Sequence, residues 1–314
     1  MAAVSVLLLL VKFLAFYYTG SVAILTDALE SIVNVASGFI GLYSLYVAAK
    51  PRDKDHPYGH GKAEFLSAAV EGTMMLLAGI LIVYNAMQHL LFGIGVRKID
   101  LGIWLVAVTA VLNYIMGTVC IRYGRINNSL ALTASGKHLQ ADTWSTVGII
   151  AGLVVLYFTG LKWIDIVLAI GIALFIMYTG YRILRRSIAG IMDEADEKLL
   201  LGLVDLLNQN RQVNWVDLHN LRVIKYGSVL HIDCHLTVPW YLNVHEAHVE
   251  IDKLAGLVKQ KFGETVELFV HSDGCLPFQC HICNKQDCTV RQQEFEQKVI
   301  WTLENISQNK KHGA

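Results

Sequence analysis

Charge is scarce in this sequence, and the two signs balance. Asp, Glu, Lys and Arg together make up 17% of the 314 residues, with 26 basic and 26 acidic side chains and a formal net charge of zero. Nucleic-acid-binding proteins usually carry a basic excess, so this balance argues against DNA or RNA as a partner. No internal repeat or low-complexity tract is evident either, so nothing in the chain suggests a repeat array.

The first residues lack the cleavage site of a secretory signal peptide. The opening sequence MAAVSVLLLLVKFLAF is apolar enough for one, but no A-x-A-like motif follows it, and further apolar stretches come directly after it. We therefore interpret it as a first membrane-spanning segment. It begins without a polar leader, so we expect the natural chain to start further upstream.

Long apolar stretches are what the sequence has in abundance, because aliphatic, aromatic and sulfur-containing residues make up 54% of it. A helix that crosses a bilayer needs about 20 mostly apolar residues. Lys and Arg gather in the connections after the second, fourth and sixth stretches, so the positive-inside rule predicts that both termini are cytosolic. The predicted spans are 2–18, 21–48, 64–92, 100–122, 130–159 and 163–184.

After about residue 190 the continuous apolar runs give way to amphipathic segments. Their order, αββαβ, predicts a small open sheet with helices on one face, an α+β arrangement. We therefore expect a mainly α-helical membrane protein with a six-helix transmembrane domain at 1–190, a cytosolic α+β domain at 191–274, and a cysteine-containing loop and helix at 275–314. The predicted helices are 193–210, 243–262 and 290–307, and the predicted strands are 217–227, 229–240 and 265–273.

Polar side chains interrupt two of the predicted spans. Asp27, Glu30 and Asn34 are spaced three and four residues apart, and so share one helix face, while His138 and Asp142 form a second pair four residues apart. A charge inside a spanning helix costs about 2.5 to 3.5 kcal/mol on insertion scales, so each marks a functional site by default. Imidazole with carboxylates suits zinc and accepts iron, cobalt, nickel or manganese. The alternative is a set of interhelical hydrogen bonds, which two pairs on separate spans make less favoured.

Three segments carry a resemblance to a known family. SVAILTDALESIVN, HPYGHGKAE and KHLQAD together resemble the cation diffusion facilitator family, over nearly the whole chain. The resemblance implies six spans, a cytosolic ferredoxin-like metallochaperone domain, a homodimer, and efflux of divalent metal ions by alternating access coupled to proton entry. Zinc is the leading ion, with cadmium added to the metals named above. Metal ligation requires deprotonated ligands, which gives this exchange a physical rationale.

The resemblance also implies a transport site. It consists of Glu30 and Asn34 on the second span with His138 and Asp142 on the fifth, and Asp27 is a further candidate ligand. Many relatives have Asp or His where this chain has Glu30, and Asp where it has Asn34. The second difference is the larger one, because an amide oxygen is a weaker ligand than a carboxylate and cannot titrate.

The loop RDKDHPYGHGKAE offers a second group of ligands. The resemblance assigns an accessory zinc to Asp53, His56 and His60, and the intervening Pro and Gly favour a turn that lets both imidazoles converge. Two solvated histidines are the alternative interpretation. The resemblance further implies a salt bridge between Lys62, at the start of the third span, and Asp193, just past the sixth, that ties the two membrane domains together.

Histidines are dense in the predicted cytosolic domain. The resemblance implies a zinc-binding group there, with some ligands bridging the two protomers, whereas any single histidine taken alone is more often simply solvated. Strand alternation places His231, Asp233 and His235 on one face and Cys234 on the other. The implied ligands are His219, His235, His248, His271 and Asp273.

Four of the six cysteines lie close together, as C-x4-C-x2-C-x4-C. Reduced cytosolic thiols at such spacing are typical of a closed structural zinc site, with His281 as a substitute ligand, although spacing alone leaves inert loop cysteines as an alternative. Many members of the family end before such a segment, so this prediction depends on these residues alone. The predicted ligands are Cys275, Cys280, Cys283 and Cys288.

Other functions make different demands on these residues. The same intramembrane ligands could line a passive metal channel, whereas a membrane-anchored metal sensor would need only the soluble domain. No nucleophile–base pair is evident, and His245 and His248 have the wrong spacing for the H-E-x-x-H motif of a zinc protease, so we do not expect an enzyme.

Overall fold

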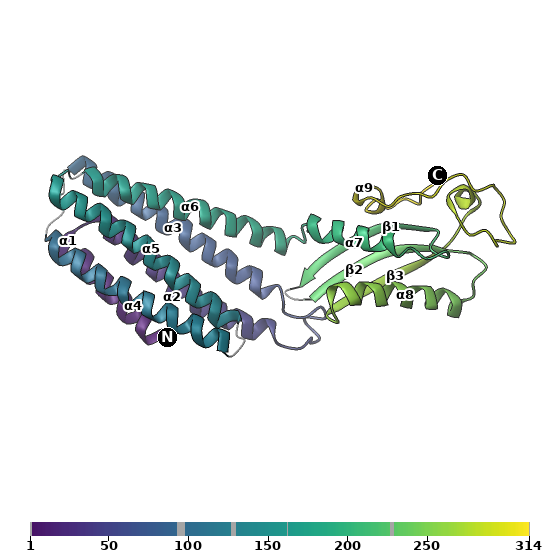
Figure 1. Ribbon diagram of the computed structural model, residues 1–314, viewed down its shortest axis with the longest axis horizontal. Helices are drawn as coiled ribbons and strands as arrows, with labels where there is room; N and C mark the ends of the chain where they lie inside the picture. Colours follow the sequence, from purple (N-terminus) through teal and green to yellow (C-terminus); the bar gives the residue numbers. More distant parts are fainter. Residues whose placement is uncertain (1, 93–97, 127–129, 162, 227–228, 314) are drawn as a thin grey trace. The chain divides into compact units, whose positions relative to one another are not determined.

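The computed structural model describes residues 2–92, 98–126, 130–161, 163–226 and 229–313 (Figure 1). The chain divides into two compact units. One unit combines Met1–Leu45 with Leu66–Ile188, and the other combines Tyr46–Phe65 with Ala189–Ala314. The loop between the second and third helices is therefore part of the same unit as the residues after the sixth.

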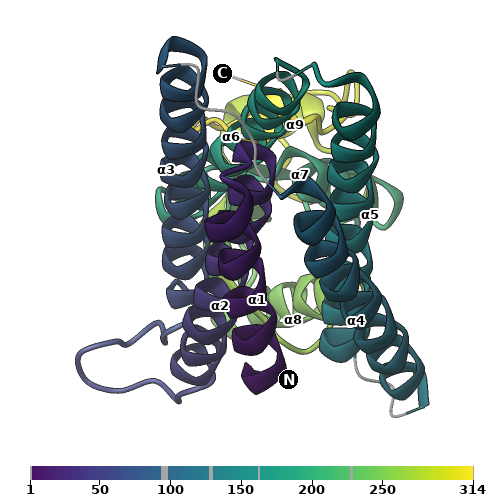
Figure 2. The same cartoon turned by 90° about the vertical axis from the view of Figure 1, so that its left-hand side faces the viewer.

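The first unit is a bundle of long apolar helices (Figures 1 and 2). Many large apolar side chains point outward, such as Leu42, Trp104 and Phe158, as expected of a surface that faces lipid rather than water. Within the described residues, α2 to α6 each contain a stretch long and apolar enough to cross a membrane, and α1 contains a shorter one, Val6–Thr19. The helices are α1 (Ala2–Thr19), α2 (Val22–Ala48), α3 (Ala63–Phe92), α4 (Ile99–Ile126), α5 (Leu130–Thr159) and α6 (Trp163–Ile191).

Helix α2 contacts both halves of the bundle. On one side Ala23 and Ile24 pack with residues of α1, α4 and α5, and on the other Val22 packs with residues of α3 and α6. The start of α2 is fixed by a buried carboxylate of α6, because Asp165 accepts hydrogen bonds from the Ser21 hydroxyl at 2.5 Å and from the Val22 amide at 2.8 Å. A negative charge at a helix N-terminus also complements the helix dipole.

Glycines allow α3 and α6 to approach each other closely. A Cβ atom added to Gly72 would lie 2.8 Å from the Gly180 carbonyl oxygen, and one added to Gly180 would lie 2.8 Å from the Gly72 carbonyl oxygen. Such small-residue contacts are the usual way for helices to associate inside a membrane, where burial of apolar surface gives no drive. The two helices run side by side in Figure 1.

The second unit contains a small mixed sheet. Among the described residues its strands lie in the order β1–β2–β3, with β1 antiparallel to β2 and β2 parallel to β3. The crossover helix α8 supplies the return that a parallel pair requires. The predicted turn at Gly227 and Ser228 lies outside the described residues. The elements are α7 (Glu197–Gln209), β1 (Asp217–Tyr226), β2 (Val229–Val238), α8 (Val244–Phe262) and β3 (Val266–Gly274).

One apolar core joins these elements. Leu203 and Leu207 of α7 and Leu254 of α8 pack against the alternate β2 residues Ile232 and Leu236. Side-chain caps begin both helices: Asp196 accepts from the Leu199 amide, and Asn243 forms a capping box with Glu246. The fold class predicted from the sequence, a helical membrane bundle followed by an αββαβ domain, is confirmed.

The predicted helix at 290–307 is wrong. The structure has a short 3₁₀ helix η1 (Pro277–Ile282), an extended segment, and only one helical turn, α9 (Leu303–Ile306). Tertiary contacts hold the backbone extended: the Asn208 side chain donates to the Trp301 carbonyl at 2.7 Å, and Arg211 donates to the Val299 carbonyl at 2.6 Å. The Arg211 guanidinium also lies 4.0 Å from the Trp301 ring centroid. The sixth span also differs from its prediction, since the helix continues to Ile191.

Trp301 should anchor the closing segment of the chain, residues 290–313. Its side chain is fully buried in the core of the second unit, so Trp301→Ala is expected to lower the free energy of unfolding by about 3 to 5 kcal/mol. Thermal unfolding of the purified protein, with limited proteolysis to locate the loosened segment, measures this. Phe295→Ala, which removes a half-exposed ring from the same segment, is the control. Equal effects of the two variants would contradict the anchoring role.

Candidate metal sites

Helices α2 and α5 bring polar side chains together inside the bundle. The Asn34 amide donates to Asp142 Oδ2 at 2.9 Å, and Asp142 is half-buried. Glu30 lies one turn before Asn34 on α2 and is also half-buried. His138 lies one turn before Asp142 on the helical backbone of α5, but its side chain lies outside the described residues. The arrangement thus gathers an amide and a carboxylate from two spans, with a second carboxylate one turn away.

Asp27 has a different set of partners. Its Oδ1 atom lies 2.9 Å from the Lys12 ammonium of α1 and accepts a 2.9 Å hydrogen bond from the Thr146 hydroxyl of α5. Lys12 also donates to the Ser31 hydroxyl at 2.8 Å, and both members of the ion pair are about 2% exposed. A buried carboxylate requires such a partner, and Lys12 supplies it. Sequence spacing could place Asp27 on the face of Glu30, but it gave no indication of this pairing.

The loop after α2 forms a compact group of possible ligands. His56 Nδ1 lies 3.0 Å and His60 Nε2 lies 3.4 Å from carboxylate oxygens of Asp53, and the three residues can present ligand atoms within 4.8 Å of one another. Asp53 also accepts hydrogen bonds from the amides of Asp55 and His56. The bond from the His56 amide lowers the pKa of Asp53, so the carboxylate remains available as an anion.

The same loop is held by other residues of the second unit. Arg52 forms an ion pair with Glu267 of β3, and the Tyr58 ring stacks on Tyr226 of β1 with centroids 5.6 Å apart. Lys62 lies 2.9 Å from Asp193, at the distance of the salt bridge that the sequence predicts. These contacts fix the loop on both sides of its group of ligands.

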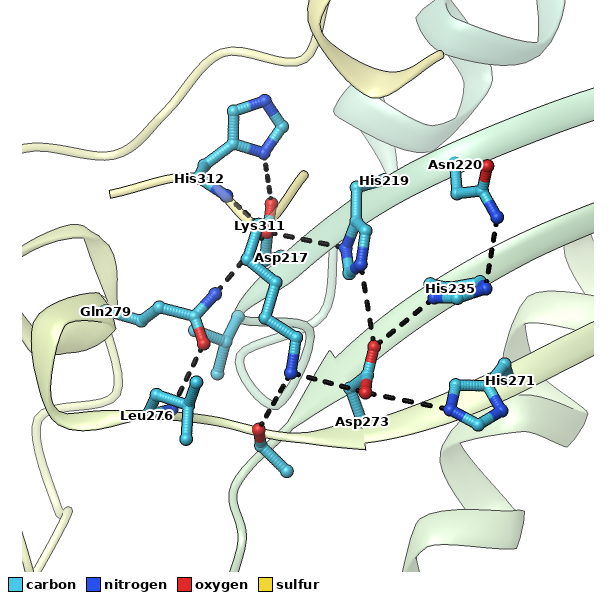
Figure 3. A network of polar contacts seen from close by, with 12 residues as sticks. Asp217, His219, Asn220, His235, His271, Asp273, Leu276, Gln279, Lys311 and His312 are labelled. Atoms are coloured by element: carbon cyan, nitrogen blue, oxygen red, sulfur yellow. Dashed lines mark hydrogen bonds and ion pairs between the residues drawn. The ribbon is translucent and has the colours of Figure 1, made fainter. Parts of the chain in front are cut away.

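The second unit gathers a histidine from each of its described strands. The register pairs His219 of β1 with His235 of β2, and His235 with His271 of β3, so the three lie in one row across the sheet. Asp273 Oδ2 lies 3.5 Å from both His219 Nε2 and His235 Nδ1, and these three residues can present ligand atoms within 4.8 Å of one another (Figure 3). We call His219, His235 and Asp273 the sheet cluster.

The two remaining predicted ligands lie outside the sheet cluster. His271 Nε2 lies 3.7 Å from Asp273 Oδ1, on the other side of the carboxylate, and its side chain is 66% exposed. His248 on α8 is equally exposed, and its Nε2 atom lies 3.7 Å from Asp252 Oδ1. Burial lowers the pKa of His219, which favours the neutral imidazole that can bind a metal.

The four clustered cysteines are all free thiols. Among the described residues, two groups of three possible ligands lie close enough together to hold a metal ion, and neither contains a cysteine. Arg291 donates to the carbonyl oxygens of Cys280 and Cys283, both at 2.8 Å, which folds the loop back on itself. Burial, with the neighbouring thiols, raises the pKa of Cys275. The loop is therefore compact, but its sulfur atoms do not come as close to one another as the ligand atoms of the other two groups do.

Two family models match the chain. The cation efflux transmembrane domain matches residues 1–192, and the cytoplasmic domain of cation efflux proteins matches residues 205–275. The first match alone covers more than half of the chain. This chain belongs to the cation efflux family. It is the cation diffusion facilitator family that the motifs predicted, so that resemblance is confirmed.

Curated relatives agree with the cation efflux assignment. The chain is 34% identical to the uncharacterized transporter sll1263 of Synechocystis sp. over 74% of this chain and 76% of that protein. It is 28% identical to the cation-efflux pump FieF of Citrobacter koseri, over 86% of this chain and 89% of that protein, and 28% identical to FieF of Shewanella oneidensis, over 86% and 90%. The cation efflux protein is thus a multi-pass integral membrane protein of a transporter family, not an enzyme family.

Proposed function

We propose that this cation efflux protein exports divalent transition-metal ions, zinc foremost, in exchange for protons. The observation that carries the proposal is the contact between Asn34 of α2 and Asp142 of α5 inside an apolar bundle. Ionisable groups inside a membrane are costly and rare, so a carboxylate within a spanning helix marks a functional site by default. Glu30 and His138 complete a set of oxygen and nitrogen ligands suited to zinc, cadmium, iron, cobalt, nickel or manganese.

Proton exchange follows from the chemistry of the ligands. A metal ion needs deprotonated carboxylates and a neutral imidazole, so its binding releases protons, and its departure allows protons to return. A site that holds either the ion or the protons, and opens to one side at a time, couples the two flows. Asp27 takes no part in our proposal, because the Lys12 ammonium already neutralises it.

The second unit binds metal and stabilises the homodimer in this proposal. Both termini lie in the cytosol, consistent with the Lys and Arg residues in the connections on that side. The loop group of Asp53, His56 and His60 and the sheet cluster bind accessory zinc ions there, with His271 and His248 available to complete the coordination or to bridge protomers. The four clustered cysteines form a structural zinc site once the metal draws the thiols together.

Transport by purified protein in liposomes tests the proposal. A zinc-sensitive dye inside the vesicles reports metal entry, and a pH difference is imposed across the membrane with cadmium, iron, cobalt, nickel and manganese run in parallel. We expect zinc to accumulate against its own gradient when protons flow outward, and the accumulation to collapse when a protonophore is added. Zinc that only equilibrates, whatever the pH difference, would favour a passive channel, and no movement at all would favour a sensor.

Asn34→Asp tests the unusual ligand of the transport site. A carboxylate binds a metal ion more strongly than an amide oxygen does, so the KM for zinc is expected to fall on the order of tenfold, or about 1.4 kcal/mol. Initial rates across a zinc concentration series measure it. Asn85→Asp, on α3 outside the proposed site, where the Asn85 amide donates to the Leu81 carbonyl, is the matched control. An unchanged KM in Asn34→Asp would remove Asn34 from the site.

A further inference from the structure

A second carboxylate lies behind the sheet cluster. Asp217 of β1 is fully buried, and its Oδ2 atom lies 3.6 Å from Nδ1 of His219. The other ring nitrogen of His219, Nε2, is the atom that faces Asp273. Asp217 therefore lies on the opposite side of the imidazole from the place where a metal ion would bind (Figure 3).

The Nδ1 atom of His219 lacks a hydrogen-bond partner although it is buried. A histidine that binds a metal through Nε2 must carry its proton on Nδ1, and metal-bound histidines almost always donate that proton to a carboxylate, a carbonyl or water. Asp217 is the acceptor in reach, at a separation slightly longer than a hydrogen bond. A small shift of either side chain would close that gap.

The closing segment of the chain fixes Asp217 in place. His312 donates its backbone amide to Asp217 Oδ2 at 2.9 Å, and its ring Nδ1 lies 2.5 Å from Oδ1. The buried Gln279 side chain donates to Oδ2 at 3.4 Å. The neighbouring Lys311 lies 3.2 Å from Asp273 Oδ1, which leaves Oδ2 facing the two imidazoles of the cluster. One short segment thus engages both carboxylates, and it lies beyond the residues that match the family's cytoplasmic domain.

We propose that Asp217 is a positioning residue of the sheet cluster, which orients His219 for metal binding and is itself held by His312. This inference depends on the proposed accessory zinc at the sheet cluster. Asp217 accepts the Nδ1 proton of His219 and so directs Nε2 toward the ion, and His312 of the closing segment holds Asp217 in place. The region outside the family match then has a function in metal binding as well as in packing.

Zinc affinity of the full-length protein tests the inference. All variants are made in a background of Asp142→Ala, Asp53→Ala and Cys288→Ser, which removes a ligand from each of the other three proposed metal sites. Competition with a chromophoric chelator then reports zinc binding. We expect Asp217→Asn to weaken it roughly 10- to 100-fold, the usual effect of losing an outer-shell partner, and His312→Ala to weaken it roughly tenfold. Asp205→Asn and His245→Ala, which change exposed side chains of α7 and α8, should bind as the background does.

A further readout and a second variant separate positioning from folding. The d–d absorption of bound cobalt should shift in Asp217→Asn and not in Asp205→Asn, because only the first changes the ligand field that His219 exerts on the cobalt ion. If Asp217→Asn does not fold, His312→Ala, in which the buried carboxylate remains, carries the test. Background-like affinity and cobalt spectra in both variants would overturn the inference.

His235→Ala distinguishes this failure from failure of the accessory site. It removes a ligand of the sheet cluster itself, so it should abolish the zinc binding that remains in the background. If it has no effect, the proposed accessory site is wrong. If it abolishes binding while Asp217→Asn and His312→Ala bind normally, only the role of Asp217 is wrong.

Discussion

Asp142→Ala is expected to abolish zinc transport while leaving the protein folded. The change removes the carboxylate that joins α5 to Asn34 of α2, and with it one ligand and one exchangeable proton of the proposed site. We expect a fall in initial rate of roughly a hundredfold or more, because changes in the outer shell of a metal site alone commonly lower affinity by about 10- to 100-fold. Zinc uptake into proteoliposomes under an imposed pH gradient measures it.

His138→Ala should have an equally large effect on transport, since it removes the proposed imidazole ligand one turn away. The matched control is Glu71→Ala, which deletes a carboxylate from α3 outside the proposed site. Protein yield and thermal unfolding should be similar for all three variants, which separates loss of a ligand from loss of the fold. Wild-type rates for Asp142→Ala would contradict a transport site between α2 and α5.

Lys12→Met should destabilise the helix bundle strongly. Lys12 is the ionic partner of Asp27, and both are buried between helices. Removing one member of a buried pair leaves an uncompensated charge and costs about 3 to 5 kcal/mol. Poor yield in membranes and a lowered unfolding temperature in detergent are the expected results.

The double variant Lys12→Met/Asp27→Asn is the sharper experiment. It removes both charges at once while the Thr146 hydroxyl keeps a partner at position 27, so it should regain most of the stability lost in the single variant. It should also transport zinc, because Asp27 is not a ligand in our proposal. Loss of transport in a well-folded double variant would return Asp27 to the metal site.

The helices of the bundle could be predicted from the sequence because long apolar runs leave few alternatives. The predicted helix ends were less accurate where charged residues follow the apolar run. The last span was predicted to stop at residue 184, whereas α6 runs on to Ile191. The charge of the arginines from Arg182 onward suggested an end to the span, but arginine is a good helix former and does not end the helix.

Contacts between segments distant in the sequence could not be predicted from its pattern. Spacing along α2 puts Asp27 and Glu30 on one face, but only packing shows that Lys12 of α1 binds the first of them. In the sheet, alternation shows which side of β2 carries His235, whereas the pairing with His219 and His271 depends on strand register. Asp217 gave no signal at all, because its partner His312 lies 95 residues further along the chain.

The backbone contact between Gly72 and Gly180 restricts how this protein can change shape. Each glycine has a carbonyl oxygen of the other helix at 2.8 Å from the position where a methyl group would begin. Sliding α3 past α6 by one residue would drive a side chain into the opposite main chain, and interiors packed this tightly switch between discrete arrangements rather than deforming smoothly. In the proposed transport cycle we therefore expect these two helices to move as a single rigid body, with the rearrangement taken up by the helices around them.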